Sequence, residues 1–472
     1  MKLNANEVKT GKYIMSNIRP LATLAIAALL AGPVSAADSL LEIYQRALQN
    51  DPTIREAEAQ YLAQAEVKPQ ARAALLPNVT AGGNMSNQFT DTLGPIPVGG
   101  NGIGTGSTTR TDTHGWSLTL TQTIFDWGRY ATLHQADKRV ARAETDYEAA
   151  KQALLIRVAT AYFNVLAAKD SLASAVSARE AISRQLEQAQ RRFEVGLIAI
   201  TDVQQSQAGY DDSVAAEIQA QRLLATSYEQ LREIIGDVVT ELASPTDELP
   251  LLSPDPASPE QWVKTALAQN LSLISSRLAA EVAEYDIDIQ KGSRLPTVNF
   301  QGSYTNSSND RAQTIHQAGG PDIFTPFPQK PEGRSWQLNV QFPLFTGGLT
   351  RSRVQQSVYT HRAATEELER IGRLTERQTR DAYLGVISEI SRVRALKQSV
   401  ESNRTALRAT EAGFEVGTQT TVDVLTAQRN LSTAETTYSR SRYDYIINVL
   451  ALKQAAGNLS VKDVEQVDGW LH

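Results

Sequence analysis

A repeated motif constrains the fold of this chain more than any other feature of its sequence. Residues 191–202 read RRFEVGLIAITD and residues 412–423 read AGFEVGTQTTVD, so Phe, Val, Gly and Asp recur in the same order 221 positions later. Other matches keep nearly this offset, from 219 to 221 positions: Leu76-Pro77 with Leu295-Pro296, Trp116 with Trp336, Phe125 with Phe345, Gly128 with Gly348, and Ala161-Tyr162 with Ala382-Tyr383. An ordered set of matches over most of the chain indicates an internal duplication, with two versions of one unit of roughly 200 residues.

The repeats leave distinct segments at both ends of the chain. We expect a signal peptide at residues 1–36, a first repeat at 37–243, a proline-rich linker at 244–259, a second repeat at 260–457 and a C-terminal tail at 458–472. An apolar run at 21–31 has the length of a signal-peptide core, and a Val-Ser-Ala tripeptide follows it, so cleavage is expected between Ala36 and Ala37. The run is shorter than the roughly 20 residues of a transmembrane helix. Translation could start at Met1 or at Met15.

Composition argues against several classes of function. The chain has no cysteine, which excludes disulfides, thiolate metal sites and lipidation of an N-terminal cysteine. Its five histidines lie far apart without ligand spacing, and paired catalytic acids, nucleophile motifs and phosphate loops are missing. We therefore expect no metal, no cofactor and no enzymatic activity. A net charge of −6 without a basic stripe argues against a nucleic-acid partner.

Four segments have the alternation of β-strands, two in each repeat. The clearest is 336–344, where Trp336, Leu338 and Val340 alternate with polar residues. The others are 116–124, 297–305 and, more weakly, 79–89. Gly-, Pro-, Thr- and Asn-rich segments at about 90–111 and 307–332 are expected to be long loops.

Each strand has one apolar face and one small polar face. A strand of about 10 residues with this pattern fits an outer-membrane barrel, although periodicity alone equally allows an ordinary half-buried sheet. Long loops on one side of the sheet and helices on the other favour the barrel. Trp116, Trp127 and Trp336 could then lie at the membrane interfaces.

The longest helices are expected where proline is missing, between Pro97 and Pro245 and after Pro343. Apolar residues there are spaced alternately four and three apart, many of them alanine, which predicts a coiled coil. The expected helices are 38–74, 128–195 and 201–235 in the first repeat, and 259–294, 348–416 and 421–456 in the second. A helix over 128–195 would be roughly 100 Å long, and the two shorter helices of a repeat could stack end to end beside it.

Four strands cannot close a membrane barrel. An open sheet edge in lipid leaves backbone groups unpaired at a cost of several kcal/mol each, and known membrane barrels begin at about 8 strands. Several chains must therefore share one barrel, and a dimer is the minimum.

The paired strands, the long helices, the IFDWG segment at 124–128 and both FEVG turns resemble the TolC family of trimeric outer-membrane channel-tunnels, over essentially all of residues 37–457. The resemblance implies a mainly α fold with a β part: long coiled helices forming a periplasmic α-barrel, and four strands per chain in a shared 12-stranded transmembrane β-barrel. It implies a homotrimer in outer-membrane lipid that is a passive exit duct for type I secretion or drug efflux, docked to a periplasmic adaptor (membrane fusion protein) and an inner-membrane transporter. Because it has no cysteine, the chain is more similar to the non-lipidated branch of the family, which is used in type I secretion. The alternative from the residues alone is a soluble periplasmic coiled-coil scaffold or adaptor, against which the four amphipathic strands argue.

The resemblance also implies a pore constriction. Asp423 matches a position that lines the closed entrance, and three copies would form a carboxylate ring that attracts cations. From spacing alone, the simpler interpretation is that Asp423 complements the dipole of the helix whose first turn contains it. The family's second entrance acid falls at Thr426, so the constriction could be a single acidic ring.

Four residues match positions that hold the entrance shut. Thr201 and Asp202 match such positions directly, whereas Gln419 and Phe414 stand where the family has an arginine and a tyrosine. Phe414 cannot hydrogen-bond Asp202, so fewer charged links are expected to hold the closed state.

Gly196 and Gly417 are expected to cap the ends of the long helices. Because adaptor tips contact these turns in the family, the exposed residues nearby are candidate adaptor contacts: Glu194, Leu197, Glu415 and Thr418.

Overall fold

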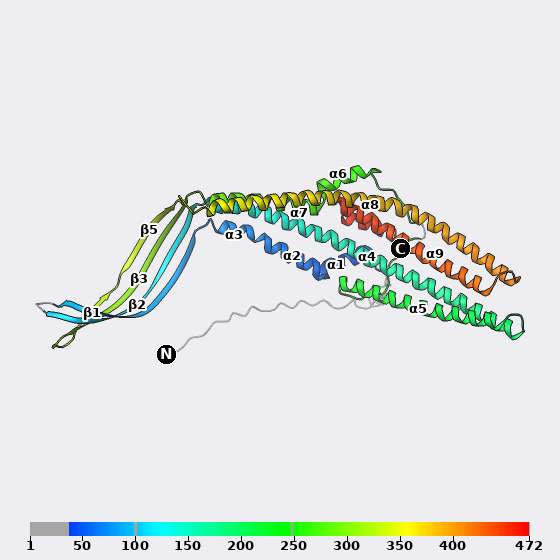
Figure 1. Ribbon diagram of the computed structural model, residues 1–472, viewed down its shortest axis with the longest axis horizontal. Coiled ribbons are helices and arrows are strands. Elements are labelled where there is room, and N and C mark those ends of the chain that lie inside the picture. Colours follow the sequence, from blue (N-terminus) through cyan, green and yellow to red (C-terminus); the bar gives the residue numbers. More distant parts are fainter. Residues whose placement is uncertain (1–36, 99–101, 247–248, 472) are drawn as a thin grey trace, which may run out of the picture.

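The computed structural model describes residues 37–98, 102–246 and 249–471. The expected signal peptide and the Ala36 side of its cleavage site lie outside the described residues. The molecule is elongated, with all strands at one end and the turns between the long helices at the other (Figure 1). Within the described part, every helix is either too short or too polar to cross a lipid bilayer.

The four long helices have the expected bounds within one or two residues. They are α4 (Trp127–Glu194, 68 residues), α5 (Ile200–Ile235), α8 (Leu349–Glu415, 67 residues) and α9 (Thr421–Ala456). Helix α5 packs antiparallel against the C-terminal part of α4, and α9 packs in the same way against α8 (Figure 1). The missing prolines and the apolar seam therefore predicted these helices correctly.

The shorter helices are more divided than expected. The segment expected as one helix at 38–74 is α1 (Leu40–Asn50), α2 (Pro52–Ala65) and α3 (Val67–Ala73), and that at 259–294 is α6 (Pro259–Gln269) and α7 (Leu271–Gly292). Asp51 and Asn270 cause the first break in each set, because each side chain accepts a hydrogen bond from a backbone N–H of the next helix. These two caps are 219 positions apart, the offset of the sequence repeat.

The stacking of short helices beside long ones is confirmed. Helices α1, α2 and α3 run along α4 beyond the end of α5, and α6 and α7 run along α8 beyond the end of α9. The tail contains an additional helix that the sequence did not suggest, α10 (Val461–Asp468), which packs against α1.

The sheet is longer than the sequence predicted. Its strands are β1 (Asn78–Val98), β2 (Gly102–Phe125), β3 (Thr297–Gln317), β4 (Ile323–Gln329) and β5 (Glu332–Gln341). All neighbours are antiparallel, β1 to β2 to β3, and β4 and β5 both pair with β3 in one continuous register, so they form one path interrupted near Pro331. The expected loops at 90–111 and 307–332 are wrong, because most of these residues are paired strand. The last strand ends at Gln341 rather than at Leu344, since Pro343 has no N–H to donate.

The main core lies in the middle of the helical part. Tyr162 and Phe163 of α4 are fully buried there with Ile235 of α5 and Ile446 of α9. The Tyr162 hydroxyl donates a 2.7 Å hydrogen bond to the carbonyl of Ala243, which anchors the segment that follows α5 to this core. A smaller core between α8 and α9 extends toward the turn.

Candidate functional site

One face of the sheet is apolar and exposed. Its side chains include Trp336, which is 72% exposed, together with Leu338, Val340 and Phe300. The Phe300 and Trp336 rings stack with centroids 5.8 Å apart. A Cβ at Gly302 on this face would lie 2.5 Å from the Trp336 ring, so any larger residue there would displace the ring. Such a solvent-facing apolar surface with aromatic residues at its margin is typical of contact with lipid.

The opposite face of the same strands is polar and almost uncharged. Between the row of Gln341 and the row of Asn309 it carries only Ser, Thr, Asn, Gln and Gly side chains. A Ser303–Ser335 hydrogen bond of 2.7 Å joins two strands on this face. The two faces therefore suit two different surroundings, lipid and water.

At the far end of the molecule, each pair of long helices is closed by a glycine turn. Gly196 and Gly417 have φ values of 76° and 82°, in the left-handed region that glycine adopts without steric cost. The turns close through hydrogen bonds from Leu197 N to the Arg192 carbonyl (2.9 Å) and from Thr418 N to the Gly413 carbonyl (2.8 Å). The expected adaptor contacts are all exposed on these turns: Glu194, Leu197, Glu415 and Thr418.

Asp423 lies in the first turn of α9 and caps it. Its carboxylate accepts hydrogen bonds from the hydroxyl of Thr420 (2.7 Å) and from its backbone N–H (2.8 Å). These bonds hold the pKa of Asp423 below its ordinary value, so the group is ionised at neutral pH. Thr426, one turn further along, is exposed, and its hydroxyl donates to the Val422 carbonyl (2.7 Å).

Of the four residues expected to hold the entrance, Thr201 and Asp202 begin α5, whereas Phe414 and Gln419 lie at the turn between α8 and α9. Asp202 accepts a hydrogen bond from the N–H of Ala199 (3.4 Å), and Thr201 is exposed beside it. Gln419 lies against Gly413, where an added Cβ would be 2.6 Å from its Cγ. Within the described ranges, no hydrogen bond joins Asp202 to Gln419.

Phe414 instead has a partner that the sequence did not reveal. The guanidinium carbon of Arg192, near the end of α4, lies 4.9 Å from the centre of the Phe414 ring on α8. Phe414 is only 8% exposed, so this cation–π contact is partly shielded from water. Arg192 lies next to the repeated FEVG motif, but nothing in its sequence context indicates a partner 222 positions away.

Further contacts join the α4–α5 pair to the α8–α9 pair behind the turns. Arg429 of α9 forms an exposed 2.7 Å ion pair with Asp212 of α5. Leu425 packs against Gly209, where an added Cβ would lie 3.0 Å from its Cδ1. Separation of the two helix pairs at this end would break these contacts together with the Arg192–Phe414 contact.

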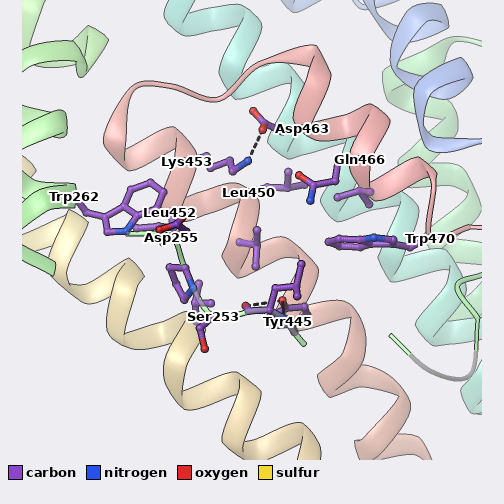
Figure 2. A pocket seen from close by; sticks show the side chains of 15 residues that line it. Ser253, Asp255, Trp262, Tyr445, Leu450, Leu452, Lys453, Asp463, Gln466 and Trp470 are labelled. Carbon is purple, nitrogen blue, oxygen red and sulfur yellow. Dashed lines mark hydrogen bonds and ion pairs between the residues drawn. The ribbon is translucent and has the colours of Figure 1, made fainter. Parts of the chain in front are cut away.

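A cavity of about 210 Å³ lies in the middle part of the molecule, and Figure 2 shows the side chains that line it. It is formed where the linker crosses α9 and α10, and Trp262, Tyr445 and Trp470 line it. The Tyr445 hydroxyl accepts a 2.8 Å hydrogen bond from Leu252 N, and an ion pair joins Lys453 to Asp463 on the cavity wall. These contacts fasten the linker and the tail, which is a structural role. No cluster of three or more metal-ligating side chains is found in the described segments.

Comparison with known proteins gives a consistent result over nearly the whole chain. The sequence model of the family described as "Outer membrane efflux protein" matches residues 43–237 and 262–458. Outer membrane protein TolC of Vibrio cholerae is 36% identical over 461 residues, covering 97% of this chain and 99% of that protein. Alkaline protease secretion protein AprF of Pseudomonas aeruginosa is 27% identical, covering 91% of this chain and 86% of that protein. Among solved structures, the CmeC outer membrane channel of Campylobacter jejuni matches with a TM-score of 0.71 at 16% identity, covering 92% of this chain and 90% of that chain.

Proposed function

The chain belongs to the outer membrane efflux protein family, and on that premise we propose that three copies form one channel-tunnel across the outer membrane and the periplasm. The protein is an outer-membrane exit duct for efflux or secretion. We propose that it works as a passive conduit without chemistry of its own, docked to a periplasmic adaptor and an inner-membrane transporter.

The observation that carries the proposal is a two-faced sheet with unpaired edges, continuous with very long helices. Among the described residues of one chain, β1 and the β4–β5 path have no strand on their outer sides. Unpaired edges in lipid cost several kcal/mol per backbone group, so edges of neighbouring chains must pair with one another. Four strand paths from each of three chains would close a barrel of ordinary size for an outer membrane. A soluble scaffold would leave the apolar face of the sheet without a partner.

We propose that Asp423 forms the pore constriction at the far end of the helices. The short Thr420 contacts keep its carboxylate ionised, and threefold symmetry would place three such charges around the axis. Because Thr426 is neutral, the constriction is proposed to be a single acidic ring.

We propose that this chain holds its entrance shut by contacts between its two helix pairs. The Arg192–Phe414 contact and the Arg429–Asp212 ion pair take the place of charged links through Gln419. We propose that Thr201 and Asp202 also help to hold the entrance shut. The proposed adaptor contacts are Glu194, Leu197, Glu415 and Thr418.

We also propose the division of the chain into repeats at 37–243 and 260–457, a linker at 244–259 and a tail at 458–472. Two separate family matches, at 43–237 and 262–458, support it. The recurrence of a cap at Asp51 and Asn270 supports it independently.

The test is single-channel recording of the purified protein in a planar bilayer. Asp423→Asn removes the charge but keeps a capping side chain, and Glu42→Gln is a matched control because Glu42 caps α1 through Ser39 in the same way. We expect wild-type conductance with block by multivalent cations, weakened block in Asp423→Asn and unchanged block in Glu42→Gln. Unchanged block in Asp423→Asn would place the constriction elsewhere, and no conductance from folded protein would refute the channel.

A further inference from the structure

Among the described strand residues, Arg311 is the single charged side chain on the polar face of the sheet. The register places Arg311 of β3 opposite Thr111 of β2 and Phe327 of β4, and Thr111 opposite Gln88 of β1. All other charged residues of the described strands lie on the opposite face or at strand ends and turns. Arg311 therefore interrupts a wall that is otherwise Ser, Thr, Asn, Gln and Gly up to its row.

Arg311 is exposed, and no ion pair to it is found among the described residues. The arginines of the other face are different. Arg110 pairs with Asp112 at 2.9 Å, and Arg334 lies 5.7 Å from the ring centre of Tyr304. The charge of Arg311 thus has no counter-charge among the residues that the structure describes, whereas Arg110 is ion-paired and Arg334 lies over an aromatic ring.

The position of Arg311 along β3 places it outside the apolar band. Tyr304 contacts Trp116 at the margin of that band that is farther from the helices, with ring centroids 5.2 Å apart. Arg311 lies seven residues beyond Tyr304 along the same strand. Seven residues correspond to about 23 Å along a strand. The guanidinium therefore lies on the polar side of the sheet, near its outer end and beyond the apolar band.

We propose that Arg311 makes the outer end of the channel a binding site for soluble multivalent anions. The inference rests on the proposed function, because three chains around one axis would place three Arg311 side chains in the same ring. A guanidinium fork matches phosphate and carboxylate oxygens in pairs, and the neutral wall offers no competing charge. The Debye length is about 8 Å at physiological ionic strength, so the ring acts on solutes passing close to it and not on the distant acidic entrance.

This assignment makes the two ends of the duct electrically opposite. The Asp423 entrance would favour cations, and the Arg311 ring would concentrate anions at the outer mouth. Anions added from outside would bind at the ring without passing the entrance. Block of the current should therefore depend on the side to which the anion is added.

The experiment uses the full mature protein in a planar bilayer with inorganic tripolyphosphate as the probe, added first to one side and then to the other. We expect block from the side of the sheet at about 0.1 M salt, with a half-blocking concentration raised at least about tenfold in Arg311→Gln and much less in Arg311→Lys. Arg110→Gln is the matched control, since Arg110 lies one register row away on the opposite face and should leave block unchanged. At 1 M salt the wild-type block should largely vanish, because the Debye length falls to about 3 Å.

Three outcomes would overturn the assignment: equal block in wild type and Arg311→Gln, equal loss of block in Arg110→Gln, and block only from the side of the helix turns. Unaltered conductance and cation block in Arg311→Gln would show that its channel is intact. Lack of any wild-type conductance would instead count against the proposed channel function, so the two failures are distinguishable.

Discussion

Replacing Arg192 by glutamine should shift the channel toward its open state. The guanidinium lies 4.9 Å from the centre of the Phe414 ring and joins the two helix pairs near their turns. Cation–π contacts are worth about 0.5–1 kcal/mol when exposed and about 2 when desolvated, and the 8% exposure of Phe414 places this one near 1 kcal/mol. If the three chains open together, the loss is about 3 kcal/mol per channel, which corresponds to an opening equilibrium shifted by about 150-fold.

The assay is the fraction of time that single channels spend in the high-conductance state, in a double-mutant cycle of Arg192→Gln and Phe414→Leu. The cycle separates the contact itself from the packing that Phe414 also provides. Arg429→Gln is the comparison, because it breaks an ion pair whose side chains are 55% and 71% exposed. Such exposed pairs are typically worth about 0.2–1 kcal/mol, so a smaller effect is expected.

Two results would refute this reasoning. Arg192→Gln could leave the open fraction unchanged, which would mean that the contact does not resist opening. Alternatively, Arg192→Gln could have the same effect in the Phe414→Leu background as in wild type, in which case the arginine acts through another partner.

Two further predictions concern the helix ends. Thr420→Val removes the hydroxyl that lowers the pKa of Asp423, so this pKa should rise. When the pH is lowered from about 6 to about 3, cation block should therefore be lost at a higher pH in the variant than in wild type. Loss of block at the same pH in both proteins would contradict this. Gly417→Ala should cost only about 1–2 kcal/mol of left-handed backbone strain, whereas Gly457→Ala should cost at least about 1 kcal/mol more, because its Cβ would lie 2.3 Å from the Gln269 carbonyl oxygen. Thermal unfolding of the two variants checks this, and equal losses of stability would show that the close approach at Gly457 can relax.

The regular helices were determined by the sequence alone, because their causes are local. Missing prolines, apolar spacing and a glycine at each end predicted α4 and α8 to within one or two residues, and Gly196 and Gly417 have the positive φ that their positions require. Alternation with a period of two likewise separated the faces of the strands around Trp336, since adjacent side chains of a strand point to opposite sides.

The outer half of the sheet could not be predicted in this way. Where β1, β2 and β3 extend beyond the apolar band, both faces carry mostly polar residues, so the apolar alternation that marks a strand is missing and turn-forming residues are frequent. Pairing with a neighbouring strand, a non-local interaction, keeps these residues extended. Only the assembled sheet therefore shows that Arg311 is a wall residue rather than part of a loop.

The contacts near the turns of the long helices depend even more on tertiary structure. Sequence identified Phe414 and Gln419 as departures from the family pattern but could not give their neighbours, which are Arg192 and Gly413. The Arg192–Phe414 contact joins residues 222 positions apart and arises from how two coiled helix pairs lie against each other. Local propensity decides where each helix begins and ends, whereas the partner of a side chain at its surface is decided by packing between helices distant in the sequence.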